Sequence, residues 1–274
     1  MTAPDIAIGG GHRLYLRDWG SGQPVVLLSG WGMDGRGWGE TMVALNAAGF
    51  RTIAYDRRGH GRSTDPRGHD YDTLADDLAA VLDGLDLHEA VLVGHSGAGG
   101  EIIRYLTRHG ASRVARVARV ARVVLLGATG PRMVAPAPGE PGIPAEMVEL
   151  GIARIAGDLP GWIAENIDAF APQADADTLR WLAAMVLDAS RRALVDFQRA
   201  IMTSDFTDEA AAIAVPVRII HGDLDASAAL DLTARRYAAL IPGAELVVYE
   251  GVAHGVMITH AARLAADIAR EGPS

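Results

Sequence analysis

The stretch VLVGHSGAGG, residues 91–100, decides the fold of this chain and suggests its chemistry. An apolar run ends at Gly94, and EIIRYLTRHG at 101–110 has the pattern of a helix. Ser96 therefore lies at a tight turn between a buried strand and a helix, where a strained backbone projects a serine Oγ into a site. The pattern of this nucleophile elbow is G-x-S-x-G, but here Ala98 takes the last position. That position chiefly needs a small residue, so we expect Ser96 to be a nucleophile.

A glycine-rich phosphate loop is the alternative interpretation of the same stretch. Such loops carry G-x-G-x-x-G, or end in Gly-Lys followed by Ser or Thr. Residues 91–100 contain neither pattern. The context of strand, serine and helix therefore favours the nucleophile elbow.

Short apolar runs recur along the chain and alternate with helical patterns. The runs expected to form strands are 12–19, 23–30, 51–59, 90–96, 122–130, 216–223 and 244–251. Helical spacing occupies 71–87, 101–110 and 230–241. Buried strands that alternate with helices predict an α/β fold, with a mostly parallel, doubly wound sheet. In such sheets the chemistry lies in loops at the carboxyl ends of the strands.

Residues 131–213 interrupt this alternation. They begin with a proline-rich stretch and continue as helical patterns with no strand between them. We predict a helical cap at 131–213, inserted into an α/β core formed by 1–130 and 214–274. We expect most of its large apolar side chains to pack the cap's own core, and one or two to face a pocket. These side chains are Trp162, Phe170, Trp181, Met185, Phe197 and Met202.

The composition excludes several classes of function. A net charge of -9 argues against nucleic acid or an anionic membrane as a partner. The absence of cysteine excludes disulfides, thiolate metal sites and a cysteine nucleophile. The histidines show no HxH or HxxxH spacing, so we expect no metal. No signal-peptide pattern and no apolar run of about 20 residues is present, so we expect a cytoplasmic protein without a membrane span.

A serine nucleophile needs a base and an acid, and in this fold they follow it in the order acid, then histidine. His254 comes directly after the last predicted strand, where a loop can return an imidazole to Ser96. Asp225 follows the preceding strand and can hold the imidazole tautomer. Asp223 is the rival, although it could instead tie the turn through a hydrogen bond to the backbone. The placement in the loop favours Asp225. His95, beside the nucleophile, is expected to turn away from the serine Oγ.

The oxyanion of an acyl transfer needs two backbone N–H donors. We expect Gly97 to supply one, because it follows the nucleophile. The other should come from the loop after the first buried strand, where we expect Trp31. Each donor supplies about 3 kcal/mol of transition-state stabilisation.

A threefold Arg-Val-Ala repeat at 113–124 has a period of three that fits neither helix nor strand. An anion-binding stripe of arginines is one interpretation. A solvated helix end or loop before the next strand is favoured, and no function is assigned to the repeat.

Together these residues resemble the α/β-hydrolase superfamily, and within it the bacterial cofactor-free haloperoxidases and perhydrolase-like esterases. The matching segments spread over nearly the whole chain: YDRRGHGRS at 55–63, YDTLADDLAAVL at 71–82, VLVGHSGAGGEIIRYLTRHG at 91–110, SDFTDE at 204–209, HGDLD at 221–225 and EGVAHG at 250–255. The resemblance implies an α/β-hydrolase fold, a triad of Ser96, Asp225 and His254, oxyanion amides from Trp31 and Gly97, and catalysis without a cofactor.

Three departures from the family pattern bear on function. The family usually has His-Gly-Trp-Pro in the oxyanion loop, whereas residues 29–32 are Ser-Gly-Trp-Gly. That proline is associated with perhydrolase activity, so Gly32 favours an esterase. Ala98 replaces the usual glycine of the elbow. A Val-Pro or Ile-Pro pair commonly follows the acid, but here 226–229 are Ala-Ser-Ala-Ala.

The leading hypothesis is a serine hydrolase acting on a small carboxylic ester or lactone through an acyl-enzyme on Ser96. The alternative is a cofactor-free haloperoxidase or perhydrolase, or other non-hydrolytic chemistry on the same fold. A ligand receptor without turnover is a third class, which the complete set of Ser, Asp and His disfavours. The sequence leaves open the substrate's identity and the oligomeric state.

Overall fold

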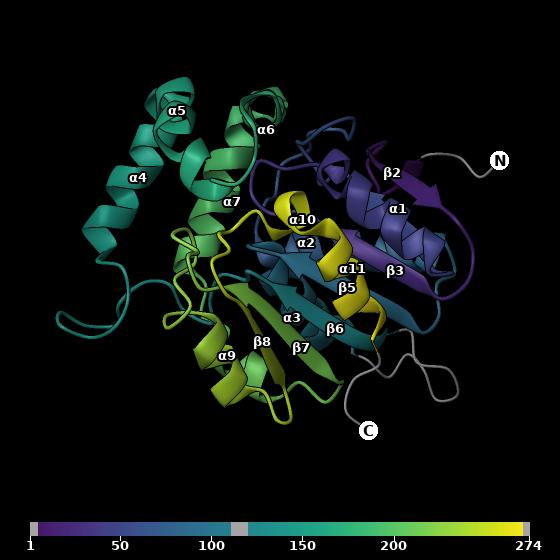
Figure 1. The fold of residues 1–274 in the computed structure, drawn as a ribbon. Helices are drawn as coiled ribbons and strands as arrows, with labels where there is room; N and C mark the ends of the chain where they lie inside the picture. Colours follow the sequence, from purple (N-terminus) through teal and green to yellow (C-terminus); the bar gives the residue numbers. More distant parts are fainter. Residues whose placement is uncertain (1–4, 111–119, 271–274) are drawn as a thin grey trace.

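The computed structural model describes residues 5–110 and 120–270, in which helices cover both faces of an eight-stranded sheet (Figure 1). The strand order is β1-β2-β4-β3-β5-β6-β7-β8. The strands are β1 Asp5–Ala7, β2 Arg13–Trp19, β3 Pro24–Leu28, β4 Arg51–Tyr55, β5 Ala90–His95, β6 Val120–Leu126, β7 Val217–Gly222 and β8 Glu245–Tyr249. Strand β2 pairs antiparallel with β1 and β4, and the strands from β4 to β8 in this order are parallel. The predicted α/β-hydrolase fold with a mostly parallel, doubly wound sheet is confirmed.

Alternate side chains of the central strands enter two separate hydrophobic cores. In β3, Val26 and Leu28 face one core, whereas Val25 and Leu27 face the other. The first core lies against α2 Tyr71–Gly84, α3 Ala98–His109 and α9 Ala234–Leu240, and the second against α1 Gly39–Ala47 and α11 Ala261–Ala269. Each fully buried aliphatic side chain contributes about 1.5–3 kcal/mol. Burial on both faces explains why these strands are continuous apolar runs.

Helix α2 shows how local sequence sets the bounds of an element. The Asp70 side chain caps its first turn by accepting a hydrogen bond from the Thr73 amide at 2.9 Å. Leu74, Leu78 and Leu82 then place one apolar stripe on the first core. The helix ends at Gly84, earlier than the helical pattern at 71–87 predicts, because the chain turns and the Leu87 amide bonds back to the Leu82 carbonyl.

Five helices lie between β6 and β7, and Figure 1 shows α4–α7 grouped beside the sheet. They are α4 Ala145–Gly157, α5 Leu159–Phe170, α6 Ala176–Asp188, α7 Arg191–Thr203 and α8 Thr207–Ala211. Helices α6 and α7 are separate, because the Ser190 side chain caps a new helix at the Ala193 amide. The division into a core (1–130 and 214–274) and a cap (131–213) stays a prediction.

The inserted helices have apolar cores of their own, and the loop after β3 enters them. Ile163 of α5 and Leu194 of α7 are buried in one cluster, against which Trp31 packs. The Trp31 indole also donates a hydrogen bond to the Leu194 carbonyl at 2.8 Å. Met33 is buried beside Met185 in a second cluster. The loop expected to carry an oxyanion donor is therefore fixed by the inserted helices as well as by the sheet.

Two short elements complete the described part of the chain: the 3-10 helix η1 Gly35–Trp38 and helix α10 Val256–Thr259. Residues 113–119 of the Arg-Val-Ala repeat lie outside the described residues, and 120–124 belong to β6. Within the described residues, no helix combines the length and the apolar character that crossing a membrane requires.

Two helical glycines predict opposite effects of the same substitution. A Cβ at Gly100 of α3 would lie 2.6 Å from the Phe206 ring and 2.8 Å from the Tyr71 ring, whereas a Cβ at Gly151 of α4 meets nothing within 4 Å. Gly100→Ala should lower the free energy of unfolding by about 1–3 kcal/mol through overpacking. Gly151→Ala should raise it by up to about 1 kcal/mol, because alanine favours the helix. Urea unfolding of both variants checks this, and equal shifts of the two midpoints would contradict it.

Candidate active site

Ser96 lies at the point where β5 turns into α3, and its backbone has φ +56. This left-handed conformation is unfavourable for a residue with a Cβ and requires support from its surroundings. The support comes from three hydrogen bonds. The Ser96 amide donates to the Leu126 carbonyl at 2.9 Å, and the Ser96 carbonyl accepts from the amides of Gly99 at 3.0 Å and Thr129 at 3.3 Å. Ser96 is the strained residue of the turn, as the elbow interpretation predicts.

The structure also explains how the elbow accommodates Ala98. Ala98 is the first residue of α3, is fully buried, and has no positive φ. The close approach falls instead on Gly94, where a Cβ would lie 2.7 Å from the Ala98 carbonyl oxygen. It also falls on Gly97, where a Cβ would lie 2.6 Å from Ile201. Glycine is therefore needed before and directly after the serine, while the next position accepts a methyl group.

His254 and Asp225 form a buried hydrogen-bonded pair. His254 Nδ1 and Asp225 Oδ2 are 2.6 Å apart. The other carboxylate oxygen, Oδ1, accepts the amides of Ser227 at 2.9 Å and Ala228 at 2.8 Å. Backbone amides thus orient the carboxylate in a loop that lacks the proline usual in the resembled family. Burial alone would raise the pKa of Asp225, but His254, and to a smaller degree His221, outweigh it and hold that pKa below its ordinary value.

Asp223, the rival acid, has a different environment. It is exposed, and its Oδ1 accepts a hydrogen bond from the Gly251 amide at 2.7 Å. This bond ties the loop after β7 to the loop after β8, which carries His254. Asp223 therefore supports the turn, and the contact with the imidazole is made by Asp225.

Two further histidines surround the pair. His95 Nε2 is 3.2 Å from the His254 carbonyl, and the two rings are tilted with centroids 4.6 Å apart. Burial, together with the neighbouring His254, lowers the pKa of His95 well below its ordinary value, so it is neutral and donates to that carbonyl. His221 Nε2 lies 2.6 Å from the Ala228 carbonyl and 3.3 Å from Asp225 Oδ2. His95 therefore contacts the backbone of His254 itself, and His221 contacts the loop and the carboxylate that hold the imidazole.

Ser96 and His254 line the same cavity. Among the described residues no hydrogen bond joins their side chains. Such bonds are often long in the absence of substrate and tighten in the complex, so the shared cavity is the relevant observation.

The loop after β3 forms a tight turn beside the serine. The Gly30 carbonyl accepts the Met33 amide at 3.3 Å, and Gly32 has φ +69, which together are features of a type II turn. A Cβ on Gly30 would lie 2.9 Å from the Ser96 Cβ, which places the loop directly against the elbow. Within the described part of the chain, neither the Trp31 amide nor the Gly97 amide has a hydrogen-bond acceptor. Both expected oxyanion donors are therefore free.

A cavity of about 250 Å³ opens above Ser96 and His254. Three of the six large apolar cap residues line it, namely Trp162, Phe170 and Met202, which is more than expected. Of the other three, Met185 is buried in a cluster of the inserted helices, Phe197 is buried in the first core against the sheet, and Trp181 is exposed, so most of the six do not pack a core of the cap alone. Among residues 5–110 and 120–270, no cluster of three or more His, Cys, Asp or Glu side chains is placed to bind a metal ion.

Several cavity residues were not identified from sequence. One face of α5 contributes Ile163, Asn166, Ile167 and Phe170, whose spacing of three and four residues could have marked the face but not its direction. Thr129 follows β6, so its position after a strand was a usable signal. Gln198 of α7 adds a polar side chain that the sequence did not distinguish.

Comparison with known proteins gives a consistent picture. Residues 25–267 match the model of the alpha/beta hydrolase family. The non-heme chloroperoxidase CPO-A1 of Kitasatospora aureofaciens is 35% identical over 257 residues, which cover 90% of each chain. The bifunctional esterase/perhydrolase DCH of Acinetobacter calcoaceticus is 31% identical over 94% of this chain and 95% of its own. The structure of the esterase EaEST from Exiguobacterium antarcticum superposes with a TM-score of 0.90 at 28% identity, covering 97% of this chain and 98% of its own. The predicted resemblance to bacterial haloperoxidases and esterases is confirmed.

The lowered pKa of Asp225 predicts a pH dependence of stability. Because the folded state favours the charged carboxylate, Asp225 stabilises the fold above the ordinary pKa of about 4, and this contribution is lost as the pH falls through the lower folded value. The free energy of unfolding should therefore fall more steeply from pH 5 to pH 3 in the wild type than in Asp225→Asn. Urea unfolding at several pH values measures the slopes. Parallel slopes for the wild type and Asp225→Asn would contradict the assignment.

Proposed function

Because the chain belongs to the alpha/beta hydrolase family, we propose that it is a serine hydrolase that cleaves a small, uncharged carboxylic ester or lactone. One observation carries the proposal. A serine with φ +56 at an elbow and a histidine bonded at 2.6 Å to a buried aspartate line the same cavity. This is the arrangement of a nucleophile, a base and an orienting acid.

In the proposed mechanism, Ser96 Oγ attacks the ester carbonyl while His254 Nε2 takes its proton. Asp225 accepts a hydrogen bond from the Nδ1–H of His254, which fixes the tautomer and stabilises the imidazolium. The amides of Trp31 and Gly97 bind the oxyanion. The imidazolium then protonates the leaving alcohol, and water activated by His254 releases the acid from Ser96.

The walls of the cavity support a small and uncharged substrate. Its lining includes Trp31, Met33, Trp162, Ile167 and Phe170, and among the described residues it contains no Lys, Arg, Asp or Glu. A charged group would lose its hydration there without gaining an ion pair. The polar groups of Asn166, Gln198 and Ser227 offer hydrogen bonds to a neutral ester or lactone.

Formation of a peracid is the second candidate, and the names of the relatives favour it. In that reaction hydrogen peroxide replaces water: its oxygen attacks the acyl-enzyme, the peracid leaves, and the Ser96 hydroxyl is restored. A halide can then be oxidised by the peracid. The proline associated with perhydrolase activity has φ near -65, whereas Gly32 has φ +69. The turn therefore has a backbone that a proline at this position cannot adopt, which supports hydrolysis as the main reaction.

Ser96→Ala tests the proposal directly. We expect the variant to lose hydrolysis of p-nitrophenyl acetate by at least about 10³-fold, because the nucleophile of the acyl-enzyme is removed. A fluorophosphonate probe should label the wild type at Ser96 and leave the variant unlabelled, as shown by mass spectrometry of the labelled peptide. Hydrolysis by Ser96→Ala at the wild-type rate would overturn the serine mechanism. A wild-type protein that the probe does not label would favour a receptor without turnover.

Gly32→Pro tests the choice between water and peroxide. The proline should break the type II turn, lower ester hydrolysis by at least about tenfold, and raise the ratio of peracid formation to hydrolysis. Both rates are measured with the same acyl donor, with and without hydrogen peroxide. Gly32→Ala is the control, because it strains the same φ but retains the backbone N–H. An unchanged ratio in Gly32→Pro, or the same change in Gly32→Ala, would contradict the role assigned to Gly32.

A further inference from the structure

Arg57, which follows β4, contacts the oxyanion loop but does not line the cavity. Its side chain is buried and donates to the Ser29 carbonyl at 2.7 Å and to the Gly30 carbonyl at 3.3 Å. The same guanidinium donates to Glu101 Oε2 from Nη2 at 2.7 Å and from Nε at 3.1 Å. A single cation therefore joins two consecutive carbonyls of the loop to a carboxylate of α3.

Glu101 is itself held firmly. It lies in the first turn of α3, the helix that begins behind Ser96, and it is fully buried. The Tyr55 hydroxyl donates to its other oxygen, Oε1. Burial and the Glu101 carboxylate raise the pKa of Tyr55 well above its ordinary value, so the phenol keeps its proton and remains a donor. Both carboxylate oxygens are thus occupied, which fixes the position of the guanidinium.

The geometry of the peptide group connects Arg57 to the proposed oxyanion hole. In a trans peptide the C=O and the following N–H point in opposite directions. The Gly30 carbonyl points toward Arg57 and Met33, so the Trp31 N–H points away from them. A rotation of this peptide that moved the Trp31 amide would break the hydrogen bonds to the Gly30 carbonyl.

We propose that Arg57, held by Glu101, is a positioning residue that fixes the Trp31 amide in the oxyanion hole. This inference rests on the proposed serine hydrolase function. Among the described residues, Arg57 does not line the cavity and makes no hydrogen bond to Ser96, so its proposed action passes through the loop. Preorganised donors stabilise a developing oxyanion most when they need not reorient during the reaction. The expected effect is therefore on turnover and not on substrate binding.

The surroundings of Arg57 connect the same device to the inserted helices. Its guanidinium stacks over the Phe197 ring of α7, with 4.3 Å from Cζ to the ring centroid. The Phe197 ring also lies close to Gly97, where a Cβ would be 2.9 Å from the ring. The Trp31 amide follows a carbonyl that Arg57 contacts, and Gly97 lies beside Phe197, on which Arg57 stacks. A buried ion pair is weak evidence for stability, so the positioning of the loop is a better account of this pair.

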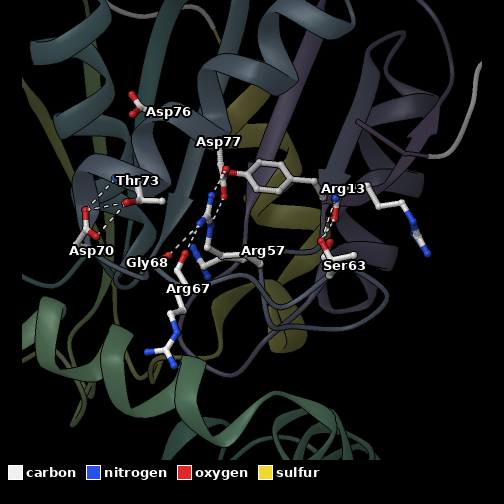
Figure 2. A network of polar contacts seen from close by, with 12 residues as sticks. Arg13, Arg57, Ser63, Arg67, Gly68, Asp70, Thr73, Asp76 and Asp77 are labelled. Carbon is white, nitrogen blue, oxygen red and sulfur yellow. Dashed lines mark hydrogen bonds and ion pairs between the residues drawn. The ribbon is translucent and has the colours of Figure 1, made fainter. Parts of the chain in front are cut away.

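Arg58 provides a matched control in the next position of the chain. It is also buried, and it forms an ion pair with Asp77 at 2.5 Å and 2.6 Å. Its remaining contacts go to the carbonyls of Arg67 and Gly68, away from the oxyanion loop. Figure 2 labels Asp77, Arg67 and Gly68, the three residues that accept hydrogen bonds from Arg58, and draws these bonds as dashed lines.

The test compares the two ion pairs in the full chain. The variant Arg57→Met/Glu101→Gln removes both charges and leaves an amide oxygen to accept the hydrogen bond from Tyr55. The control variant Arg58→Met/Asp77→Asn removes both charges of the neighbouring ion pair. For p-nitrophenyl acetate we expect the first variant to lose kcat by about 10–10³-fold, with KM within about threefold of the wild type. Its inhibition by a trifluoromethyl ketone, which forms an oxyanion on the serine, should weaken by a similar factor. The control pair should keep kcat, KM and inhibition within about threefold.

Arg57→Lys retains the positive charge, and it tests the positioning role of Arg57 if the double variant does not fold. One ammonium group cannot reproduce the planar set of donors to Glu101 and to two carbonyls, so we expect kcat to fall by at least about fivefold with KM unchanged. A folded Arg57→Met/Glu101→Gln, or Arg57→Lys, with kcat at the wild-type value would overturn the inference. Equal losses of kcat in the two double variants would also overturn it.

The failure of this inference differs from that of the proposed function. If Ser96→Ala is inactive and Arg57→Met/Glu101→Gln keeps the wild-type kcat, the serine mechanism is supported and the positioning role of Arg57 is refuted. If Ser96→Ala hydrolyses the ester at the wild-type rate, the proposed serine mechanism is refuted, and so is the positioning role of Arg57 that depends on it.

Discussion

The left-handed backbone of Ser96 is the constraint on which the arrangement around the cavity depends. Strand β5 becomes helix α3 within two residues, and φ +56 at Ser96 makes that change of direction possible. The strain is of order 1–3 kcal/mol and persists only where packing on all sides enforces it. Gly94 and Gly97 admit that packing, because a side chain at either position would collide with Ala98 or Ile201. The serine thus stands at the carboxyl edge of the sheet, pressed against the loop after β3.

The parallel sheet brings the remaining groups to the same edge. The carboxyl ends of β5, β7 and β8 carry Ser96, Asp225 and His254 respectively. These strands are separated by long stretches of sequence, yet β7 and β8 are adjacent and β6 is the one strand between them and β5. Because the ends of β7 and β8 are neighbours, His254 and Asp225 can approach to 2.6 Å. The loop after β6 packs against both of them at Gly127. The topology is therefore sufficient to gather the proposed triad.

This regularity explains which features could be predicted from sequence. Seven of the eight strands lie within or close to apolar runs, and the proposed triad residues follow such runs directly; β1, with three residues, is too short for a pattern. The walls of the cavity could not be predicted, because the direction of the apolar face of α5 depends on how the inserted helices pack. The pairing of Arg57 with Glu101 also could not be predicted from sequence, because the two residues are 44 positions apart and only the fold brings them together.

Arg57 and Gly32 act on consecutive peptide groups of the oxyanion loop. Arg57 holds the Gly30 carbonyl and so directs the Trp31 amide, while the positive φ of Gly32 sets the turn just after it. In the proposed mechanism the first peptide supplies an oxyanion donor, which hydrolysis and peracid formation need alike. The second peptide differs between this chain and a loop with proline, because proline lacks the N–H and requires a negative φ. Selection between water and peroxide would then reside in the backbone around Gly32, and the stabilisation common to both reactions in the contacts of Arg57.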